Sequence, residues 1–472
     1  MDQIEADYVI VGAGAAGMAF ADTLLTDTDA TVTLIDRRAR PGGHWNDAYP
    51  FVRLHGPSLN YGAPSRALGA ERLETGGINE GLLEQASGAD ILSYYDELIQ
   101  RRFLPSGRVT WLPQTDWRDG VATSRVTGER TRLRARRKLV DAPHADTRLP
   151  LTEPPNFAVG PGVRLVPPHG LADLDRSAEG YVILGSGKTA MDCVVWLLEA
   201  GIPAERITWI RPREPWLLPR ENAQPAFDFF EPTIGALAAE LEAARGAVSL
   251  DDLFRRLEAA GLLVRIDRTV TPTMYRCAIV SAPELELLRR VKAVVRLGHV
   301  TAIEADRILL ERGAVPTSPG RVHVNCTADG IPRRPPQPVF EAGRITLQYV
   351  RRCSPCFSAA FVAHVEATVA GEAEKNALCR PVPAPHEPLD WLRMHLEDSV
   401  NRRAWAQSAE LQGWLAASRL DRFTGMIARA GREPTPERLA ILKRYREAAG
   451  PALERMADLM AGAPSPASLE PA

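Results

Sequence analysis

The sequence predicts an α/β fold with two Rossmann-like dinucleotide-binding domains and a C-terminal helical extension. In two places, around residues 7–36 and 181–211, a short β-branched run leads through a glycine-rich turn into a helical pattern and a second strand. Short connections of this kind are typical of βαβ units, which build parallel sheets. The third observation is the stretch from about 387 to 461, whose apolar residues recur at helical spacing.

Composition narrows the class of protein further. The chain has 472 residues, 45% hydrophobic and 25% charged, as expected for an ordinary globular protein. Lys and Arg number 57 against 59 Asp and Glu, so there is no basic excess for nucleic acid. No apolar run of ~18 residues predicts a membrane span, and residues 1–5 lack the basic start of a signal peptide. Six scattered cysteines form no disulfide framework or zinc ribbon, so we expect no metal site and a reducing, cytoplasmic location.

The first βαβ unit carries a G-x-G-x-x-G turn between its strand, residues 7–11, and its helix, residues 14–25. Gly12 permits a tight turn, Gly14 lets a pyrophosphate approach the backbone, and Gly17 lets the helix pack closely on the strand. The next strand ends in Asp36, an acid placed to accept hydrogen bonds from a ribose 2′-hydroxyl. Strand, turn, helix and acid together predict a dinucleotide site.

The second unit repeats the pattern with Gly185-Ser186-Gly187-Lys188-Thr189-Ala190 between a strand at 181–184 and a helix at 188–200. A triphosphate P-loop is excluded, because Val182 stands where that motif requires a glycine. The following strand ends in Arg211 and Arg213 instead of an acid. Because a guanidinium suits a 2′-phosphate, this ending favours NADPH over NADH.

Two further stretches carry a resemblance to a known group of proteins. Gly42-Gly43-His44-Trp45, followed by Tyr49-Pro50, and the run from Trp209 to Arg220 are similar to stretches of the flavin-containing and Baeyer–Villiger monooxygenases. These are the class B flavoprotein monooxygenases, in which an FAD domain contains an inserted NADPH domain. The resemblance implies an FAD- and NADPH-dependent enzyme that oxygenates a nitrogen, a sulfur or a carbonyl of a small molecule with O2, through a C4a-(hydro)peroxyflavin.

The resemblance and the motifs give a set of expected cofactor contacts. On the FAD side they are Gly12, Gly14, Ala15, Gly17, Asp36, Arg37, Gly42, Gly43, His44, Trp45 and Asp329. On the NADPH side they are Gly185, Gly187, Lys188, Thr189, Arg211 and Arg213. Residues 324–330 are expected to close the flavin site, and a helix within 348–369 to point its N-terminus at the flavin.

The expected domain order follows from these assignments. The FAD domain begins at 1–175, the NADPH domain with a helical insertion spans 176–290, and the FAD domain closes over 291–370. A helical cap at 371–462 and a disordered tail at 463–472 complete the chain. We also expect a helix over 90–104 with Asp90 as its N-cap, and a proline-rich linker over 150–168.

Two departures from the monooxygenase pattern bear on the chemistry. The F-x-G-x-x-x-H fingerprint is absent from residues 150–180, where His169 does not have the required spacing. His55 stands where Baeyer–Villiger enzymes carry an aspartate. A histidine titrates near neutral pH, so His55 is the one candidate for acid–base catalysis, and a packed loop histidine is the alternative.

Other functions remain open at this point. Cys353 and Cys356 form a C-x-x-C next to the expected helix, which is compatible with an NADPH-dependent disulfide oxidoreductase or dithiol oxidase, or with two packed thiols. A non-catalytic binding protein on the same scaffold is a third hypothesis. The expected partners are a small-molecule substrate and O2, with a homodimer possible, and no pattern identifies the substrate.

Overall fold

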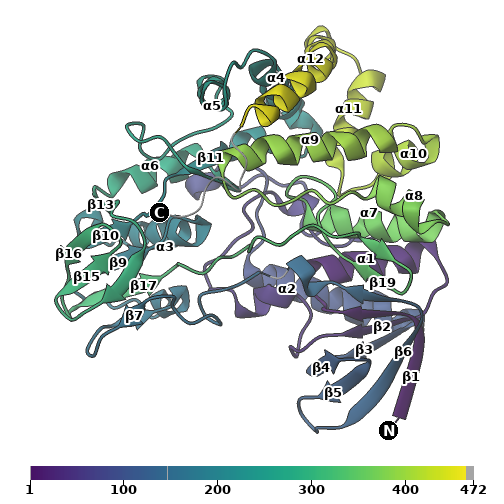
Figure 1. Ribbon diagram of the computed structural model, residues 1–472, viewed down its shortest axis with the longest axis horizontal. Coiled ribbons are helices and arrows are strands. Elements are labelled where there is room, and N and C mark those ends of the chain that lie inside the picture. The colour runs from purple at the N-terminus through teal and green to yellow at the C-terminus, as the bar shows by residue number, and fades with distance from the viewer. Residues whose placement is uncertain (1, 146, 464–472) are drawn as a thin grey trace.

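The computed structural model describes residues 2–145 and 147–463 and confirms the α/β class (Figure 1). The described strands form four sheets, the two largest of them built mainly from parallel strands. Of the tail predicted to be disordered, residues 464–472 lie outside the described residues. None of the described helices is both long enough and apolar enough to cross a bilayer.

The first sheet contains the first βαβ unit. Its path runs β18-β19-β6-β1-β2-β3, and the antiparallel hairpin β4–β5 extends from β6. The strands of this sheet are β1 (Asp2–Val11), β2 (Val32–Ile35), β3 (Val109–Leu112), β4 (Thr115–Arg118), β5 (Val121–Ser124), β6 (Arg130–Asp141), β18 (Phe340–Glu341) and β19 (Arg344–Thr346). Every residue of β2 is buried, Thr33 included, as expected for a central parallel strand rich in β-branched residues.

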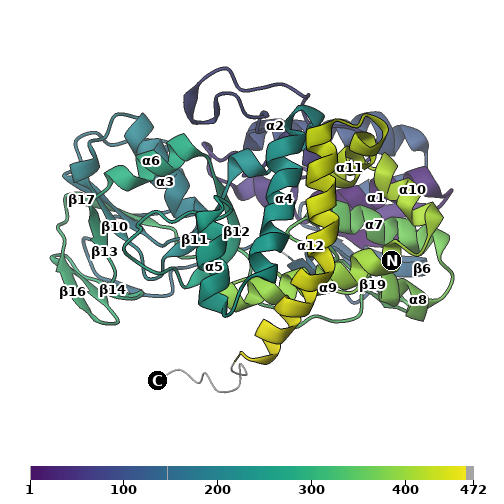
Figure 2. The same ribbon diagram turned by 90° about the horizontal axis from the view of Figure 1, so that it is seen from above.

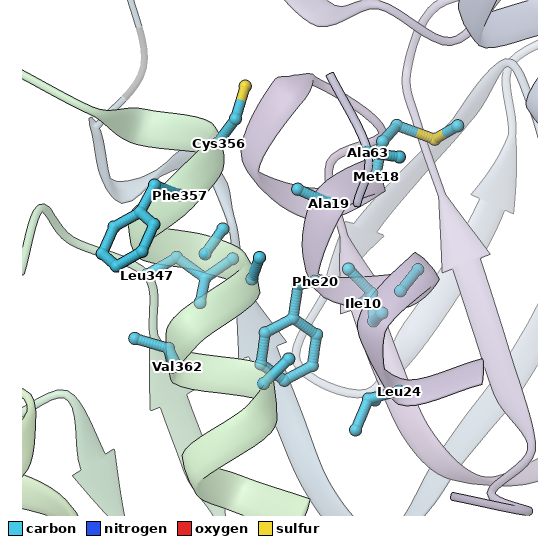
Figure 3. Packing of buried hydrophobic residues seen from close by; sticks show 14 of the residues in the cluster. Ile10, Met18, Ala19, Phe20, Leu24, Ala63, Leu347, Cys356, Phe357 and Val362 are labelled. Carbon is cyan, nitrogen blue, oxygen red and sulfur yellow. The ribbon is translucent and has the colours of Figure 1, made fainter. Parts of the chain in front are cut away.

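Two apolar helices pack against each other over this sheet. Helix α1 (Ala15–Asp27) follows the first glycine turn, and α7 (Pro355–Thr368) arrives from far along the chain. Phe20 lies between the two helices in Figure 3, and ten residues of α7 are buried. Phe361 of α7 is fully buried and contacts Trp405, the last residue of α9 (Pro388–Trp405), at 4.5 Å between ring centroids. This core joins the first sheet to the C-terminal helices.

The second sheet has the order β13-β10-β9-β17-β8, with all its pairs parallel. Its strands are β8 (Leu165–Val166), β9 (Gly180–Leu184), β10 (Ile207–Ile210), β13 (Ala293–Val295) and β17 (Arg321–Asn325). We expected 291–370 to return to the first sheet, and this is wrong for β13 and β17. The chain returns only at β18 and β19, because the register of β17 is fixed by its pairing along all five residues of β9.

Smaller elements surround the second sheet. Strands β7 (Ala158–Val159), β14 (Val300–Ile303), β15 (Arg307–Leu310) and β16 (Gly313–Pro316) form one sheet, and β11 (Pro215–Pro219) pairs with β12 (Met274–Val280). Helices α3 (Lys188–Glu199) and α6 (Ala282–Arg290) pack against each other, and α3 also contacts β9 of the second sheet. The proline-rich stretch 150–168 therefore contains β7 and β8 and is not only a linker.

The helical extension is confirmed. It consists of α8 (Glu372–Leu378), α9 (Pro388–Trp405), α10 (Ala409–Ala417), α11 (Arg422–Arg432) and α12 (Pro436–Ala461). The predicted helical insertion is present as α4 (Phe230–Arg245) and α5 (Leu250–Ala259). Figure 2 shows α4 and α12 side by side, so the insertion and the C-terminal helices form one helical layer.

The start of α2 (Gly88–Leu98) differs from the expectation. Ser87 is the N-cap, and Asp90 is the third helical residue, which completes a capping box with Ser87. The helical pattern predicted to run to 104 continues from α2 as a π-turn over Ile99–Phe103.

We predict that Phe361→Ala lowers the free energy of unfolding by about 3–5 kcal/mol, because it leaves a cavity in a fully buried cluster. Leu439→Ala is the control, since Leu439 is 47% exposed and its truncation should change stability by less than about 0.5 kcal/mol. Urea unfolding followed by tryptophan fluorescence measures both. Equal stability of the two variants would contradict the placement of α7 in the core.

Candidate functional site

The first glycine turn has the geometry that a close phosphate contact requires. Gly12 has φ +94°, and a Cβ on Gly17 would lie 1.9 Å from the carbonyl oxygen of Gly12, so only glycine fits there. Helix α1 begins at Ala15 without a side-chain cap on Gly14. The first backbone amides of α1 therefore have no acceptor within the helix. Such amides are suited to bind an anion.

Asp36 is tied to this turn. Its carboxylate accepts the amide of Ala13 at 2.8 Å and the amide of Arg38 at 2.8 Å. Burial raises the pKa of Asp36, and these two amides oppose that shift. Asp36 thus shapes the turn. Each of its oxygens keeps a lone pair, so its expected contact with a ribose hydroxyl stays a prediction.

The Gly42–Gly43 pair lies directly against the first turn. Gly42 donates its amide to the carbonyl of Ala13 at 2.8 Å, and a Cβ on Gly43 would lie 2.9 Å from Cα of Gly14. The structure therefore brings the first glycine turn and the Gly42–Gly43 pair together. A diphosphate that reaches the start of α1 would meet both glycine-rich backbones.

Three more of the residues expected at FAD, His44, Trp45 and Arg37, make contacts within the protein. The ring of His44 is 5.2 Å from that of Trp45, and Trp45 donates its indole N–H to the Tyr61 hydroxyl at 2.6 Å. The carbonyl of Arg37 accepts a hydrogen bond from Arg125. Trp45 is thus fixed by a tyrosine that the motif did not indicate.

The second glycine turn is more open. Gly185 has φ +126°, and a Cβ there would lie 2.5 Å from the carbonyl of Cys326, while a Cβ on Gly187 would meet nothing within 4 Å. Helix α3 starts after Gly187 without a side-chain cap. The buried hydroxyl of Ser186 has no hydrogen-bond partner among the described residues. Space, free helix amides and an unpartnered hydroxyl fit the phosphates of a dinucleotide.

Arg211 stands at the carboxyl end of β10, next to this turn. Its guanidinium is buried, pairs with Glu214 at 3.2 Å and lies 4.7 Å from the ring centroid of Trp209. Burial lowers the pKa of Arg211 to about 10, so it is still charged at neutral pH. Its Nε and Nη1 have no hydrogen-bond partner in the described part of the chain. Arg213, two residues after Arg211, and Thr189, two residues after Gly187, are both half-buried.

A buried ion network connects the two units. Lys188, expected at the cofactor, pairs with Asp192 and, at 2.5 Å, with Glu284. Arg220 pairs with the same Glu284 at 3.1 Å. Tyr49, which follows the Gly42–Gly43 stretch, donates its hydroxyl to Asp192 at 2.6 Å. The segment after the first site is thereby bonded to the first turns of α3.

His55 lies beside this network. Its carbonyl accepts hydrogen bonds from Arg220 at 3.0 Å and from Gln85 at 2.7 Å. Burial lowers the pKa of His55 to about 4, and the charge of Lys188 adds to the effect. His55 is therefore neutral at pH 7, where it is able to accept a proton but not to donate one as an imidazolium.

A cavity of about 100 Å³ opens at the network. Its wall includes Lys188, Asp192, Arg220 and Glu284, and the stacked rings of Phe51 and Trp196, with centroids 4.8 Å apart, form an apolar side. The motif search missed Tyr49 as a bridge, and it missed Asp192, Arg220 and Glu284. The available signals were the capping box Ser281–Glu284, which marks a helix start, and the i, i+4 spacing of Lys188 and Asp192.

Asp329 was expected at the flavin site, and this contact stays a prediction. Asp329 follows β17 in the second sheet and pairs with Arg276 at 2.6 Å. Its position results from the pairing of β17 with β9, which carries residues 324–330 to the carboxyl edge of the second sheet.

The C-x-x-C does not form a dithiol. Cys353 is disulfide-bonded to Cys277 of β12, and Cys356 is buried in α7, where its sulfur accepts the amide of Gly62 at 3.3 Å. Burial raises the pKa of the Cys356 thiol to about 11, so it is not a thiolate at neutral pH. The other free cysteines, Cys193, Cys326 and Cys379, are buried too. No group of His, Cys, Asp or Glu side chains in the described ranges is arranged to hold a metal ion.

The fold and the two turns define an α/β protein of the two-dinucleotide type. Residues 10–67 match the family described as the NAD(P)-binding Rossmann-like domain. The chain is 43% identical over 457 residues to the uncharacterized protein Rv2000 of Mycobacterium tuberculosis, covering 97% of this chain and 85% of that protein. It belongs to the same family as this mycobacterial protein.

Solved structures show a looser likeness. The closed crystal structure of cyclohexanone monooxygenase is 12% identical, with 91% of this chain and 98% of that chain covered and a TM-score of 0.47. A flavin-containing monooxygenase from Stenotrophomonas maltophilia is 16% identical, with 86% and 99% covered and a TM-score of 0.41. Both belong to the group that the sequence motifs resemble. At these values no function is transferred from them.

We predict that His55→Gln flattens the pH dependence of stability between pH 6.5 and 4. Because the folded pKa of His55 is about 4 and the ordinary value is 6.5, the unfolded chain takes up this proton first as the pH falls. The wild type should therefore lose about 2–3 kcal/mol of stability over this interval from His55 alone, and the variant should not.

Urea unfolding at a series of pH values gives the measurement. His299→Gln is the matched control, since the side chain of His299 is 56% exposed on the second domain. Identical pH slopes for wild type and His55→Gln would show that His55 is protonated as readily in the fold as in water.

Proposed function

We propose that the chain is a flavoprotein monooxygenase, with FAD at the first glycine turn and NADPH at the second. The observation that carries this is the pair of uncapped helix starts, α1 and α3, each behind a glycine turn at the carboxyl end of a parallel strand. When bound, the flavin supplies the redox chemistry, taking a hydride from NADPH and reducing O2 so that one oxygen atom enters a small molecule. The atom oxidised would be a nitrogen, a sulfur or a carbonyl carbon.

The residues of the first site would bind and orient FAD. The amides at the start of α1 and the backbone of Gly42 and Gly43 would hold its diphosphate, and Asp36 keeps the turn in place through Ala13. Trp45, fixed by Tyr61, would pack beside the cofactor. With the cofactor bound, these groups would hold the diphosphate at a buried turn, where each hydrogen bond to an anion is stronger than in water.

The residues of the second site would select NADPH. Ser186 and the amides after Gly187 would meet the diphosphate, and the unpartnered donors of Arg211 suit a 2′-phosphate. The bond from Tyr49 to Asp192 ties this turn to the segment that follows the first site. Such a link supports hydride transfer, since the two dinucleotides must approach each other across the junction.

Visible spectroscopy of the purified protein tests the proposal. We expect a yellow protein whose absorbance is bleached by NADPH without oxygen, and a transient species when O2 is admitted in stopped flow. Bleaching with a flavin–thiolate charge-transfer band and no such transient would favour the disulfide oxidoreductase. A colourless protein that ignores NADPH would contradict both enzymes.

We predict that Arg211→Gln lowers kcat/KM for NADPH by at least about tenfold and changes that for NADH by less than twofold, because only NADPH carries the 2′-phosphate. Arg268→Gln is the control, since Arg268 is exposed on the same domain. Steady-state rates with both nucleotides give the ratio. An equal loss with NADPH and NADH would assign Arg211 to stability alone.

A further inference from the structure

The helical layer lines an open cavity of about 380 Å³, and no residue of either glycine turn contributes to it. It lies between α4, α9, α10, α11 and α12, and residues 351–352 form its wall toward α7. Figure 2 shows these helices gathered in one layer. The volume falls within the range of small-molecule sites, about 300–1,000 Å³.

Most of the charges around this cavity are matched. Arg352 pairs with Glu240 at 2.9 Å and with Asp398 at 3.7 Å, and Arg351 pairs with Asp421 at 2.6 Å. His395 contacts both Glu240 and Arg352, and burial lowers its pKa, so it is neutral at pH 7. The whole lining holds these three carboxylates and four arginines, since Arg402 and Arg403 also line the cavity, so one positive charge is in excess.

Arg402 and Arg403 are the two arginines of the lining outside these ion pairs, and Arg402 is the less exposed of them. Nη2 of Arg402 donates to the hydroxyl of Tyr445 at 2.7 Å, and no carboxylate pairs with Arg402 in the part of the chain that the structure describes. Burial alone would lower the pKa of Arg402, but Tyr445 and Asp398 raise it, so the guanidinium stays charged. A charge in a cavity wall without a counter-ion is costly unless an anion joins it.

Part of the lining is apolar. Leu237 and Leu241 of α4 and Leu453 and Met456 of α12 line the same cavity. A ligand that satisfies both Arg402 and this apolar part has one anionic end and one apolar body. A volume of about a dozen water molecules, each about 30 Å³, is enough for a monocarboxylate of roughly eight carbons.

We propose that this cavity binds a small amphiphilic carboxylate, with its anionic end on Arg402 and its apolar body against the leucines of α4 and α12. The site is separate from the two glycine turns and does not depend on the reaction proposed for them. Arg402 gives the charge and the fork of donors that a carboxylate prefers. The apolar wall selects against small inorganic anions.

Isothermal titration calorimetry of the purified full chain with sodium octanoate tests this, with octanamide as the neutral ligand of the same length. We expect octanoate to bind at least tenfold more tightly than octanamide. Arg402→Gln should weaken octanoate binding roughly tenfold to hundredfold, the effect of losing one charge-assisted interaction, and leave octanamide unchanged. Arg432→Gln, at an exposed position of α11 that does not line the cavity, should change either affinity by less than twofold.

A second variant distinguishes a role of Arg402 in folding from a role in ligand binding. If circular dichroism shows that Arg402→Gln does not fold, Arg402→Lys keeps the charge without the fork and should bind octanoate a few-fold more weakly than wild type. Equal affinity for octanoate and octanamide, or unchanged octanoate binding in a folded Arg402→Gln protein, would overturn the proposal. Because binding is read without NADPH or flavin turnover, failure here leaves the proposed enzyme function standing.

Discussion

The relative placement of the two nucleotide turns depends on one buried ion network. Glu284 accepts both Lys188 and Arg220, and Asp192, bonded to Lys188, also receives the hydroxyl of Tyr49. Each of these charges is expensive to bury alone, and removing one partner of such a pair typically costs about 3–5 kcal/mol. The network is therefore stable only when the segment after the first glycine turn, the start of α3 and the start of α6 meet. It fixes the junction at which two dinucleotides would have to approach each other.

The rule that a buried charge needs a partner also identifies the arginines whose partners are incomplete. Lys138, buried under α7, has both Glu366 and Glu372, and Arg352 has two carboxylates in the helical layer. Against this background, the unpartnered donors of Arg211 and the missing counter-ion of Arg402 are conspicuous. A buried polar group without a hydrogen-bond partner requires an explanation, and a bound ligand is one that fits both sites. The two arginines point to different ligands, since Arg211 follows β10 beside the second glycine turn and Arg402 lines the cavity of the helical layer.

The sequence predicted what local chemistry determines. Both glycine turns, their strands and helices and the helical extension follow from periodicity and from glycines within short segments. The sheet that β17 joins, the Cys277–Cys353 bond and the network follow from contacts between distant residues, such as Tyr49 with Asp192, 143 positions apart. No local pattern encodes such a pairing. Ser87 and not Asp90 is the N-cap of α2. Both residue types suit that position, and only the geometry of the preceding chain selects between them.

The protonation states at the junction restrict the chemistry that the protein itself performs. Burial lowers the pKa of His55 to about 4 and raises that of Tyr49 well above its ordinary value. Although burial alone would have the opposite effect, the ion pairs hold the pKa of Glu284 below and that of Lys188 above their ordinary values. None of these four groups changes charge near pH 7, so none of them is suited to act there as both acid and base. A junction of this kind is better suited to binding, orientation and exclusion of water, which is the part left to a protein when cofactors carry the redox chemistry.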